Sequence, residues 1–383
     1  FFVFLLATWC VFQLWSCPRS RSVKWPGGGY THCATMSSSI SSILRAKRTN
    51  PSSVLRRVAI VGGTHGNELA GVHLVQHYEN QPELIRRQGL ETTTLLSNLD
   101  AIQADRRYVA TDLNRCFDFE FLEKADQTAA KERVSEQSRA LELDQKLGPK
   151  FSESPATDMV FDLHNTTANC GILLCFHKDD TFSREIAAYL KQNVDPEICT
   201  SFWAQDDPPF LPSIGRSGMT VEVGPVAHST VRADIYEKAK AILTNALDYI
   251  ELHNRYIQNK DDPSITKIQV KLPVAERVAQ VDYPRDPKGR LSAFIHPNLQ
   301  GKAELLPGNT VKHGDPVFQS LAGEAIPLDV TSLVADETLD KNASFFPMFI
   351  NEAAYYEKGT AFFLTRLVEK DVTILSPKSQ AKL

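Results

Sequence analysis

Four side chains in this sequence have the chemistry of a hydrolytic metal centre. His65 and Glu68 lie three residues apart, and His164 and Glu222 follow further along the chain. Two imidazoles and one carboxylate are a common ligand set for a catalytic zinc ion, which keeps a further position for water. The second carboxylate is then available as a base. The sequence therefore predicts one zinc ion per subunit, held by His65, Glu68 and His164, with Glu222 beside it.

The first of these segments has the pattern of a buried parallel strand with a tight exit. Residues 58–61 form an apolar run, and Gly62 and Gly63 after it permit a sharp turn that brings His65 back toward the sheet. If the turn that follows is helical, His65 and Glu68 project to the same side and can share one ion.

A second apolar run, residues 159–163, ends directly before His164. Ligand sites in open α/β sheets lie at the carboxyl ends of strands, so we expect the two histidines to converge. Asp162 is interpreted as the residue that orients the imidazole of His164. A lone His-x-x-Glu, or a lone histidine at a strand end, is common by chance. The combination with a third strand that ends at Glu222 is what indicates a site.

The apolar pattern predicts an α/β fold with a mostly parallel or mixed sheet flanked by helices. Helices are expected at residues 129–147, 183–194 and 233–254, and Gly148-Pro149 should end the first of them.

After Asn259 the pattern changes to short apolar runs separated by Pro, Gly and Asp. Strands are expected at residues 267–272, 291–295 and 345–350. We therefore expect three parts: a leader at 1–56, a catalytic domain at 57–258 and a smaller β-rich C-terminal domain at 259–383.

The bulk composition excludes several classes of protein. The 383 residues, 42% of them hydrophobic, can bury a large core. A net charge of −4 without charged blocks gives no nucleic-acid footprint. The seven cysteines are odd in number and contain no Cys-x-x-Cys, which argues against a disulfide framework or a structural zinc site.

The first 56 residues differ in character from the rest. Residues 1–15 are strongly apolar but short for a membrane span, and they resemble the core of a signal peptide. Residues 36–57 are rich in Ser and Arg and lack acids. We expect a disordered leader or a gene-model extension, with translation starting at Met36, and a cytoplasmic protein. A real leader would direct it to mitochondria or to secretion, so membrane association stays open.

Longer segments carry a resemblance that extends from about Arg57 to about Lys370. They are residues 62–68, 107–115, 162–167, 222–225, 281–285, 296–300 and 351–358. Together they resemble the aspartoacylase and aminoacylase-3 family, a branch of the zinc carboxypeptidase-like fold. The resemblance implies a zinc-dependent amidohydrolase whose C-terminal domain caps the active site.

The same resemblance implies a role for each motif residue. Glu222 would take a proton from water and return it to the leaving amine. Arg107 would face the carbonyl oxygen as it becomes an oxyanion. Asn114 and Arg115 would hold the α-carboxylate of the amino acid. Tyr355 would reach the pocket from the C-terminal domain.

Two further assignments follow from the family. His164 would contact the substrate as well as the metal, and Glu352 would hold Tyr355 or an arginine in place. Without the family, Glu222 would be interpreted as a solvated or paired acid, Arg107 as a surface cation and Tyr355 as a core residue.

The segment before Glu222 departs from aspartoacylase, which has an arginine ten residues before its base to recognise the side-chain carboxylate of N-acetylaspartate. Pro212 occupies that position here, and Arg216 could substitute only if the loop runs differently. Residues 226–229 also differ from the Gln-Pro-Gln-Gly usual in both branches.

We therefore favour an aminoacylase-3-like hydrolase of N-acetyl L-amino acids with uncharged or aromatic side chains. Aspartoacylase proper, a zinc carboxypeptidase and a non-catalytic binding protein are the alternatives. The acyl group and a homo-oligomeric state stay open.

Overall fold

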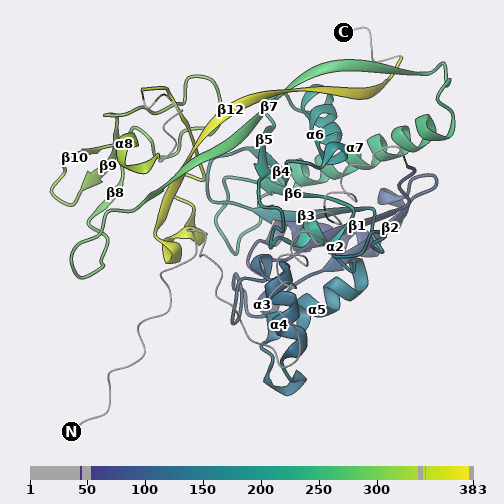
Figure 1. Ribbon diagram of the computed structural model, residues 1–383, viewed down its shortest axis with the longest axis horizontal. Coiled ribbons are helices and arrows are strands. Elements are labelled where there is room, and N and C mark those ends of the chain that lie inside the picture. The colour runs from purple at the N-terminus through teal and green to yellow at the C-terminus, as the bar shows by residue number, and fades with distance from the viewer. Residues whose placement is uncertain (1–43, 45–52, 335–339, 341, 379–383) are drawn as a thin grey trace, which may run out of the picture.

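The computed structural model describes residue 44, residues 53–334, residue 340 and residues 342–378. Most of the predicted leader, residues 1–43 and 45–52, lies outside the described residues. The central element is a nine-stranded sheet with the strand order β11-β12-β7-β5-β4-β6-β3-β1-β2 (Figure 1). Its strands are β1 (Arg57–Gly62), β2 (Glu91–Leu96), β3 (Met159–Asn165), β4 (Ile172–His177), β5 (Cys199–Trp203), β6 (Ser217–Val223), β7 (Ile265–Asp282), β11 (Phe346–Met348) and β12 (Thr360–Pro377).

Strands β2, β1, β3 and β6 run parallel to one another. Strand β4 pairs antiparallel with β6, whereas β5 runs parallel to both β4 and β7. Strand β12 is antiparallel to β7 and to β11. The sheet is therefore mixed, as the sequence predicted, with its parallel part where the candidate ligands lie.

Helices cover both faces of this sheet. They are α2 (Leu69–Asn80), α3 (Leu99–Gln103), α4 (Phe119–Gln127), α5 (Ser135–Leu147), α6 (Thr181–Asn193) and α7 (Ala233–Gln258), with α8 (Val330–Leu333) in the C-terminal part. Short 3-10 helices are η1 (Pro82–Ile85), η2 (Leu113–Arg115), η3 (Ala130–Glu132), η4 (Leu211–Ile214) and η5 (Ala353–Lys358).

Alternate residues of β1 show how the two faces are filled. Val58 and Ile60 pack into the core cluster that contains α2, α6 and α7. Ala59 and Val61 pack into a separate cluster with α4 and α5 on the opposite face (Figure 1). Because successive side chains of a strand point to opposite faces, a strand covered on both sides is apolar throughout. The apolar run at 58–61 has this physical origin.

The C-terminal part is built on the two longest strands. β7 and β12 pair along 18 residues each and extend out of the main sheet, which Figure 1 shows as a long two-stranded ribbon. A second sheet of β8 (Ala293–Ile295), β9 (Pro316–Ser320) and β10 (Ala325–Pro327) lies at its far end. A separate core cluster, with Phe318 and Phe362 among its members, fills this part. The predicted β-rich character is confirmed.

One predicted helix start was wrong for a local reason. The helix expected from Ala129 begins at Ser135, because Val134 has extended backbone angles and the Arg133 side chain donates to the carbonyls of Ala125 and Thr128. Its predicted end at Leu147 is correct. The turn after β1 is also not helical, since α2 starts only at Leu69.

Within the described residues, no helix has the length and apolar character needed to cross a membrane.

Candidate metal centre and active site

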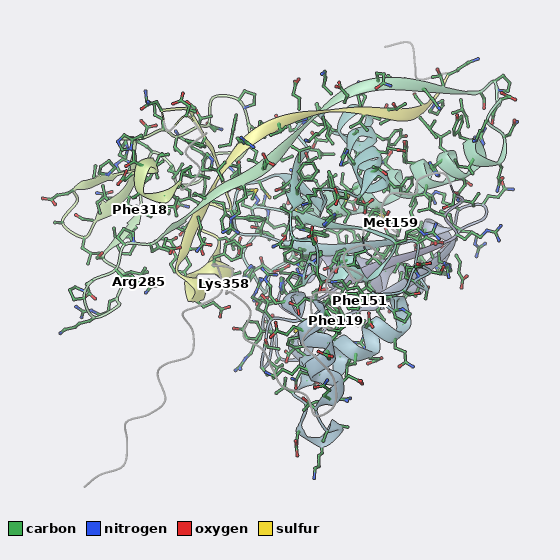
Figure 2. The ribbon with its side chains drawn as sticks, in the orientation of Figure 1. Phe119, Phe151, Met159, Arg285, Phe318 and Lys358 are labelled. Atoms are coloured by element: carbon green, nitrogen blue, oxygen red, sulfur yellow. The ribbon has the colours of Figure 1, made fainter. Side chains whose placement is uncertain are left out.

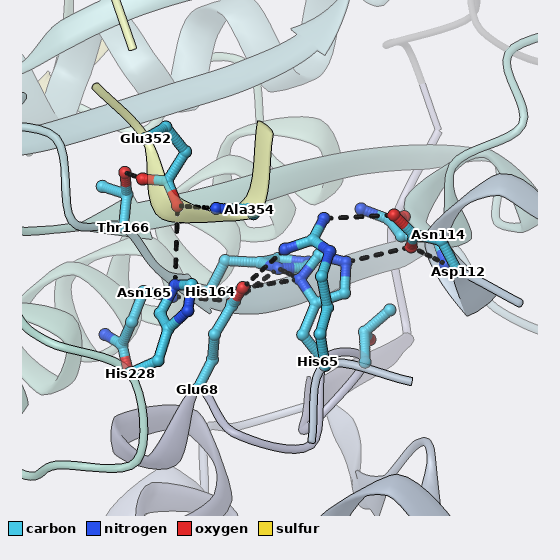
Figure 3. A network of polar contacts seen from close by, with 12 residues as sticks. His65, Glu68, Asp112, Asn114, His164, Asn165, Thr166, His228, Glu352 and Ala354 are labelled. Atoms are coloured by element: carbon cyan, nitrogen blue, oxygen red, sulfur yellow. Dashed lines mark hydrogen bonds and ion pairs between the residues drawn. The ribbon is translucent and has the colours of Figure 1, made fainter. Parts of the chain in front are cut away.

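The predicted ligands converge at the carboxyl ends of β1 and β3. His65 Nδ1 lies 2.7 Å from Glu68 Oε1, and His164 Nδ1 lies 2.9 Å from Glu68 Oε2 (Figure 3). The two Nδ1 atoms are 3.0 Å apart. All three residues are at least 97% buried. Among the described residues, these three form the one group whose donor atoms lie close enough to share a metal ion.

A tight turn brings His65 and Glu68 together. Gly63 has a φ of 73°, and a Cβ at Gly62 would lie 2.3 Å from the carbonyl oxygen of Gly71 on α2. Only glycine tolerates both conditions. The backbone N–H of Glu68 donates to the carbonyl of His65 at 3.2 Å. The two ligands therefore share a side through a non-helical turn.

Two carboxylates fix the orientation of the imidazoles. His65 Nε2 lies 3.1 Å from Asp112 Oδ1, and His164 Nε2 lies 2.7 Å from Asp162 Oδ2. A carboxylate beside Nε2 favours the tautomer with its proton there, which leaves the Nδ1 lone pair free. Two Nδ1 lone pairs would then face each other at 3.0 Å, beside a carboxylate. A cation between them removes this repulsion, so the residues fit a metal ion.

Asp162 thus contacts His164 as predicted, whereas the role of Asp112 was missed. Asp112 accepts from His65, from Arg107 Nη2 at 3.1 Å and from the backbone N–H of Asn114. Its position in a loop 47 residues after His65 gave no local signal. Only its place two residues before Asn114, as the cap of a short helix, could have indicated it.

Glu222 lies at the end of β6, directly opposite His164 in the strand register. Within the described part of the chain, no group donates a hydrogen bond to its carboxylate. Removal from bulk water raises the pKa of Glu222 to about 8, and the charges of Glu68 and Glu352 act in the same direction against His164 and Arg107. Such a group can accept and release a proton near neutral pH.

Arg107 lies between two carboxylates of the site. Its Nη1 donates to Glu68 at 3.2 Å and its Nη2 to Asp112 at 3.1 Å. Burial by itself would lower the pKa of Arg107, but the two carboxylates raise it, so the side chain is a permanent cation. Its Nε–H is buried and has no acceptor among the described residues. This donor is available for a further oxygen atom.

Asn114 and Arg115 lie on η2, close to the segment before β6. Asn114 Oδ1 accepts from the backbone N–H of Leu211 at 3.1 Å. The guanidinium of Arg115 stacks on the ring of Phe210 at 5.0 Å, and its Nη1 donates to the Asn114 carbonyl at 2.7 Å. Arg115 forms no ion pair with any described carboxylate. A half-buried arginine without a carboxylate partner is a candidate anion-binding group.

Tyr355 reaches this region from η5 of the C-terminal part. Its ring lies between those of Phe349 and Phe363, at 5.6 and 5.7 Å between centroids. Burial raises its pKa above the ordinary value, and the charges of Arg115 and Arg107 on one side and Glu222 on the other act on it. The predicted approach of Tyr355 to the site is therefore supported by the surrounding charges.

Glu352 lies at the site and contacts both the loop after β3 and the short helix η5. Its carboxylate accepts from Thr166, from the hydroxyl and N–H of Thr167 and from the N–H of Ala354 (Figure 3). His228 Nε2 lies 3.5 Å away. Glu352 holds no arginine among the described residues, but it caps η5, the short helix that carries Tyr355, and its backbone carbonyl accepts from the N–H of Tyr355. It fastens the loop after β3 to the C-terminal part.

Arg216 is placed away from the site. It immediately precedes β6, and its Nη2 pairs with Asp158 Oδ1 at 3.2 Å, while Glu222 lies at the other end of that strand. Six residues of strand separate the two by roughly 20 Å. Pro212 is buried in η4.

Fold and site together define an α/β enzyme with a buried His-Glu-His ligand set at the carboxyl ends of parallel strands. Comparison with known proteins identifies its family. The succinylglutamate desuccinylase/aspartoacylase catalytic domain matches residues 54–250, and the barrel-sandwich hybrid domain of the same family matches residues 276–367. The chain therefore belongs to the succinylglutamate desuccinylase/aspartoacylase family.

Its curated relatives carry two names. A probable aspartoacylase of Nostoc is 37% identical over 81% of this chain and 96% of its own length. The aspartoacylase of Rattus norvegicus is 37% identical over 81% and 92%. The N-acyl-aromatic-L-amino acid amidohydrolase (carboxylate-forming) of Xenopus laevis is also 37% identical, over 81% and 93%. The crystal structure of murine aminoacylase 3 superposes with a TM-score of 0.72, at 31% identity over 85% of this chain and 99% of that one.

Proposed function

We propose that this chain is a zinc-dependent amidohydrolase that cleaves N-acyl L-amino acids into a carboxylate and a free amino acid. One observation carries the proposal: two histidines and a glutamate able to share a metal lie next to Glu222 and near Arg115. Among the described residues, Glu222 has no hydrogen-bond donor and Arg115 has no ion-pair partner. The first group suits a metal, the second a proton acceptor, and the third a substrate carboxylate.

His65, Glu68 and His164 would hold the zinc ion, with Asp112 and Asp162 orienting the imidazoles. Zinc bound there would acidify water and polarise the amide carbonyl. His164, at the floor of the site, would also contact the substrate.

Glu222 would accept the proton of the attacking water and return it to the departing amine. Its raised pKa supports the second step, because a carboxyl group that holds a proton near pH 7 can also donate it. The absence of other donors leaves both carboxylate oxygens free for this exchange.

Arg107 would stabilise the oxyanion through its unpaired Nε–H. Arg115, with Asn114, would bind the α-carboxylate, since a planar guanidinium can donate two parallel hydrogen bonds. Tyr355 would close the pocket from the C-terminal part.

We propose uncharged, including aromatic, side chains as the preferred substrates. Phe210 covers Arg115 and stacks on Trp203 at 5.0 Å, so an aromatic wall adjoins the carboxylate clamp. Pro212 offers no charge, and Arg216 is paired with Asp158 at the far end of β6.

Aspartoacylase activity is the second candidate, and Lys358 is the observation that favours it. Its Nζ lies 3.6 Å from Asp112 Oδ2, and its side chain is 37% exposed. Burial, with help from the charge of Arg115, lowers the pKa of Lys358 to about 8. This cation could read a side-chain carboxylate, and Lys358→Ala would then abolish any preference for N-acetylaspartate.

The test is a comparison of substrates on the purified chain with zinc. N-acetyltyrosine and an S-aryl N-acetylcysteine should be hydrolysed more efficiently than N-acetylaspartate, while Glu222→Gln should be inactive on all of them. Hydrolysis of a tetrapeptide but of no N-acetyl amino acid would indicate a carboxypeptidase instead. A folded chain that retains no zinc and hydrolyses nothing would favour a binding protein.

A further inference from the structure

A lysine whose side chain has no exposed surface contacts the two segments that carry Arg115 and Phe210. Lys150 follows α5, and its side chain is 0% exposed. Removing an ammonium group from water is costly unless hydrogen bonds and an opposite charge compensate. A lysine at such a position is therefore held by specific partners, and the identity of those partners indicates its role.

The partners of Lys150 come from two separate segments. Its Nζ donates to the carbonyl of Phe117 at 2.5 Å, to Asp207 Oδ1 at 2.5 Å and to the carbonyl of Pro208 at 2.7 Å. Phe151, the next residue, packs edge-to-face on Phe119 at 5.4 Å, which Figure 2 shows below the sheet. Through these three hydrogen bonds the ammonium joins Phe117 to residues 207–208.

Further hydrogen bonds join the same two segments to each other directly. The N–H of Phe119 donates to Asp207 Oδ2 at 2.8 Å, and the N–H of Phe117 donates to the carbonyl of Pro209 at 3.2 Å. The first segment continues directly from Arg115, and the second leads directly into Phe210. Lys150 is the common anchor of the two side chains that stack on each other at the carboxylate clamp.

We infer that Lys150 is a positioning residue for the substrate wall, the pair formed by Arg115 and the Phe210 ring that covers it. It holds the two segments that carry this pair together through its bonds to Phe117, Asp207 and Pro208. The inference rests on the proposed function insofar as that wall binds substrate. The hydrogen bonds of Lys150 to Phe117, Asp207 and Pro208 involve no proposed metal ligand, so its loss should change substrate binding without changing the metal centre.

Trp203 provides a readout that does not depend on activity. Its ring stacks on that of Phe210. The sequence has four tryptophans, so in a full-length chain with Trp9, Trp15 and Trp25 replaced by Phe, Trp203 is the single remaining one. In that background, Lys150→Met should shift the Trp203 emission to longer wavelength and increase its quenching by acrylamide.

Kinetics on N-acetyltyrosine then separate positioning from damage. Lys150→Met should raise KM about tenfold or more, change kcat less than about threefold and leave the zinc content unchanged. The matched control is Asp158→Asn, which also removes a buried charge. Asp158 lies in the same segment between α5 and β3 but pairs with Arg57 and Arg216. The control should lower the melting temperature while leaving KM and the Trp203 emission as they were.

Lys150→Met combined with Asp207→Asn removes both charges and guards against a trivial folding defect. The double variant should recover stability relative to Lys150→Met but keep the raised KM, because the bonds to Phe117 and Pro208 are still missing. An unchanged KM together with an unchanged Trp203 emission in either Lys150 variant would overturn the inference, as would equal effects of Asp158→Asn. If the unmodified chain hydrolyses no N-acetyl amino acid while Trp203 responds as expected, the proposed function fails and the positioning role stands.

Discussion

A carboxylate lies at each end of the neighbouring strands β3 and β6, and the two carboxylates differ in their hydrogen bonds and in the direction of their pKa shifts. At the amino ends, Asp158 accepts from the backbone N–H of Arg56, from the N–H and guanidinium of Arg57, and pairs with Arg216. These donors lower its pKa against the effect of burial. At the carboxyl ends, Glu222 has no donor among the described residues, and its pKa rises to about 8.

The difference distinguishes a structural carboxylate from a reactive one. Buried polar groups are nearly always satisfied by hydrogen bonds, and Asp158 follows this rule. Glu222 is only partly buried and has no hydrogen-bond donor among the described residues. Asp158 is fully paired and serves the attachment of β1 to β3, whereas Glu222 is left free beside a metal-ligand set. The same strands therefore carry a paired structural carboxylate at one end and the proposed reaction site at the other.

The largest effect should come from removing a ligand at the carboxyl end. His164→Ala, or His65→Ala, should abolish zinc retention and activity, because two remaining ligands cannot replace the chelate of three. Metal content by atomic emission and turnover of N-acetyltyrosine measure this. Asp158→Asn at the other end should retain both. Full activity in a metal-stripped His164→Ala variant would contradict the assignment.

Removing the free carboxylate should give the next largest effect. Glu222→Gln should keep zinc and reduce kcat by about a hundredfold or more, the usual scale for a general base. Parallel assays of metal and turnover separate the two functions. Loss of zinc in this variant would instead indicate that Glu222 is a fourth ligand. Glu222 would then not be the free carboxylate that the comparison with Asp158 assumes.

Substrate preference tests whether Arg216 belongs to the structural end. Because residue 212 is Pro and not Arg, kcat/KM for N-acetylaspartate should be roughly ten- to a hundredfold lower than in an enzyme with arginine at this position. A charged hydrogen bond contributes an effect of this size. Arg216→Ala should leave the ratio of kcat/KM for N-acetylaspartate and N-acetyltyrosine unchanged. A selective loss of N-acetylaspartate activity would move Arg216 to the active site.

The smallest effect concerns acid stability at the amino ends. Because the pKa of Asp158 is lowered in the folded state, its ionised form stabilises the protein above the unfolded pKa of about 3.9, and this contribution is lost as the pH falls through the folded value. Asp158→Asn should cost about 1–3 kcal/mol at pH 7. Denaturant titrations should show that the gap between variant and parent closes below about pH 4. A gap that persists at pH 2 would indicate that the charge is not its cause.

The metal end could be predicted because its signals are local. His65 and His164 each follow an apolar run that must be a buried strand, and parallel strands bring their carboxyl ends together. Local signals also gave the end of α5 at Leu147 and the start of α7 at Ala233. The proposed division at residues 258 and 259 stays a prediction, since β7 belongs both to the main sheet and to the C-terminal part.

The remaining site residues depend on contacts between distant segments. Asp112 becomes a partner of His65 only through a loop, and Glu352 meets Thr166 across 186 residues of chain. The burial of Lys150 also has no local signal, because nothing in its own segment shows that its ammonium meets residues 207–208. Such contacts follow from topology, which spacing along the sequence does not reveal.

The ribbon of β7 and β12 has a consequence for the protein during its synthesis. β7 must wait for its partner until residues 360–377 have been made, with an edge of 18 residues open to other strands. At about 5–20 residues per second, translation from β7 to β12 takes on the order of ten seconds. The nascent chain already contains every metal ligand in that interval but lacks Tyr355, and it exposes a long unpaired edge of the kind that aggregates. Protection by a chaperone would be most valuable to this protein late in translation.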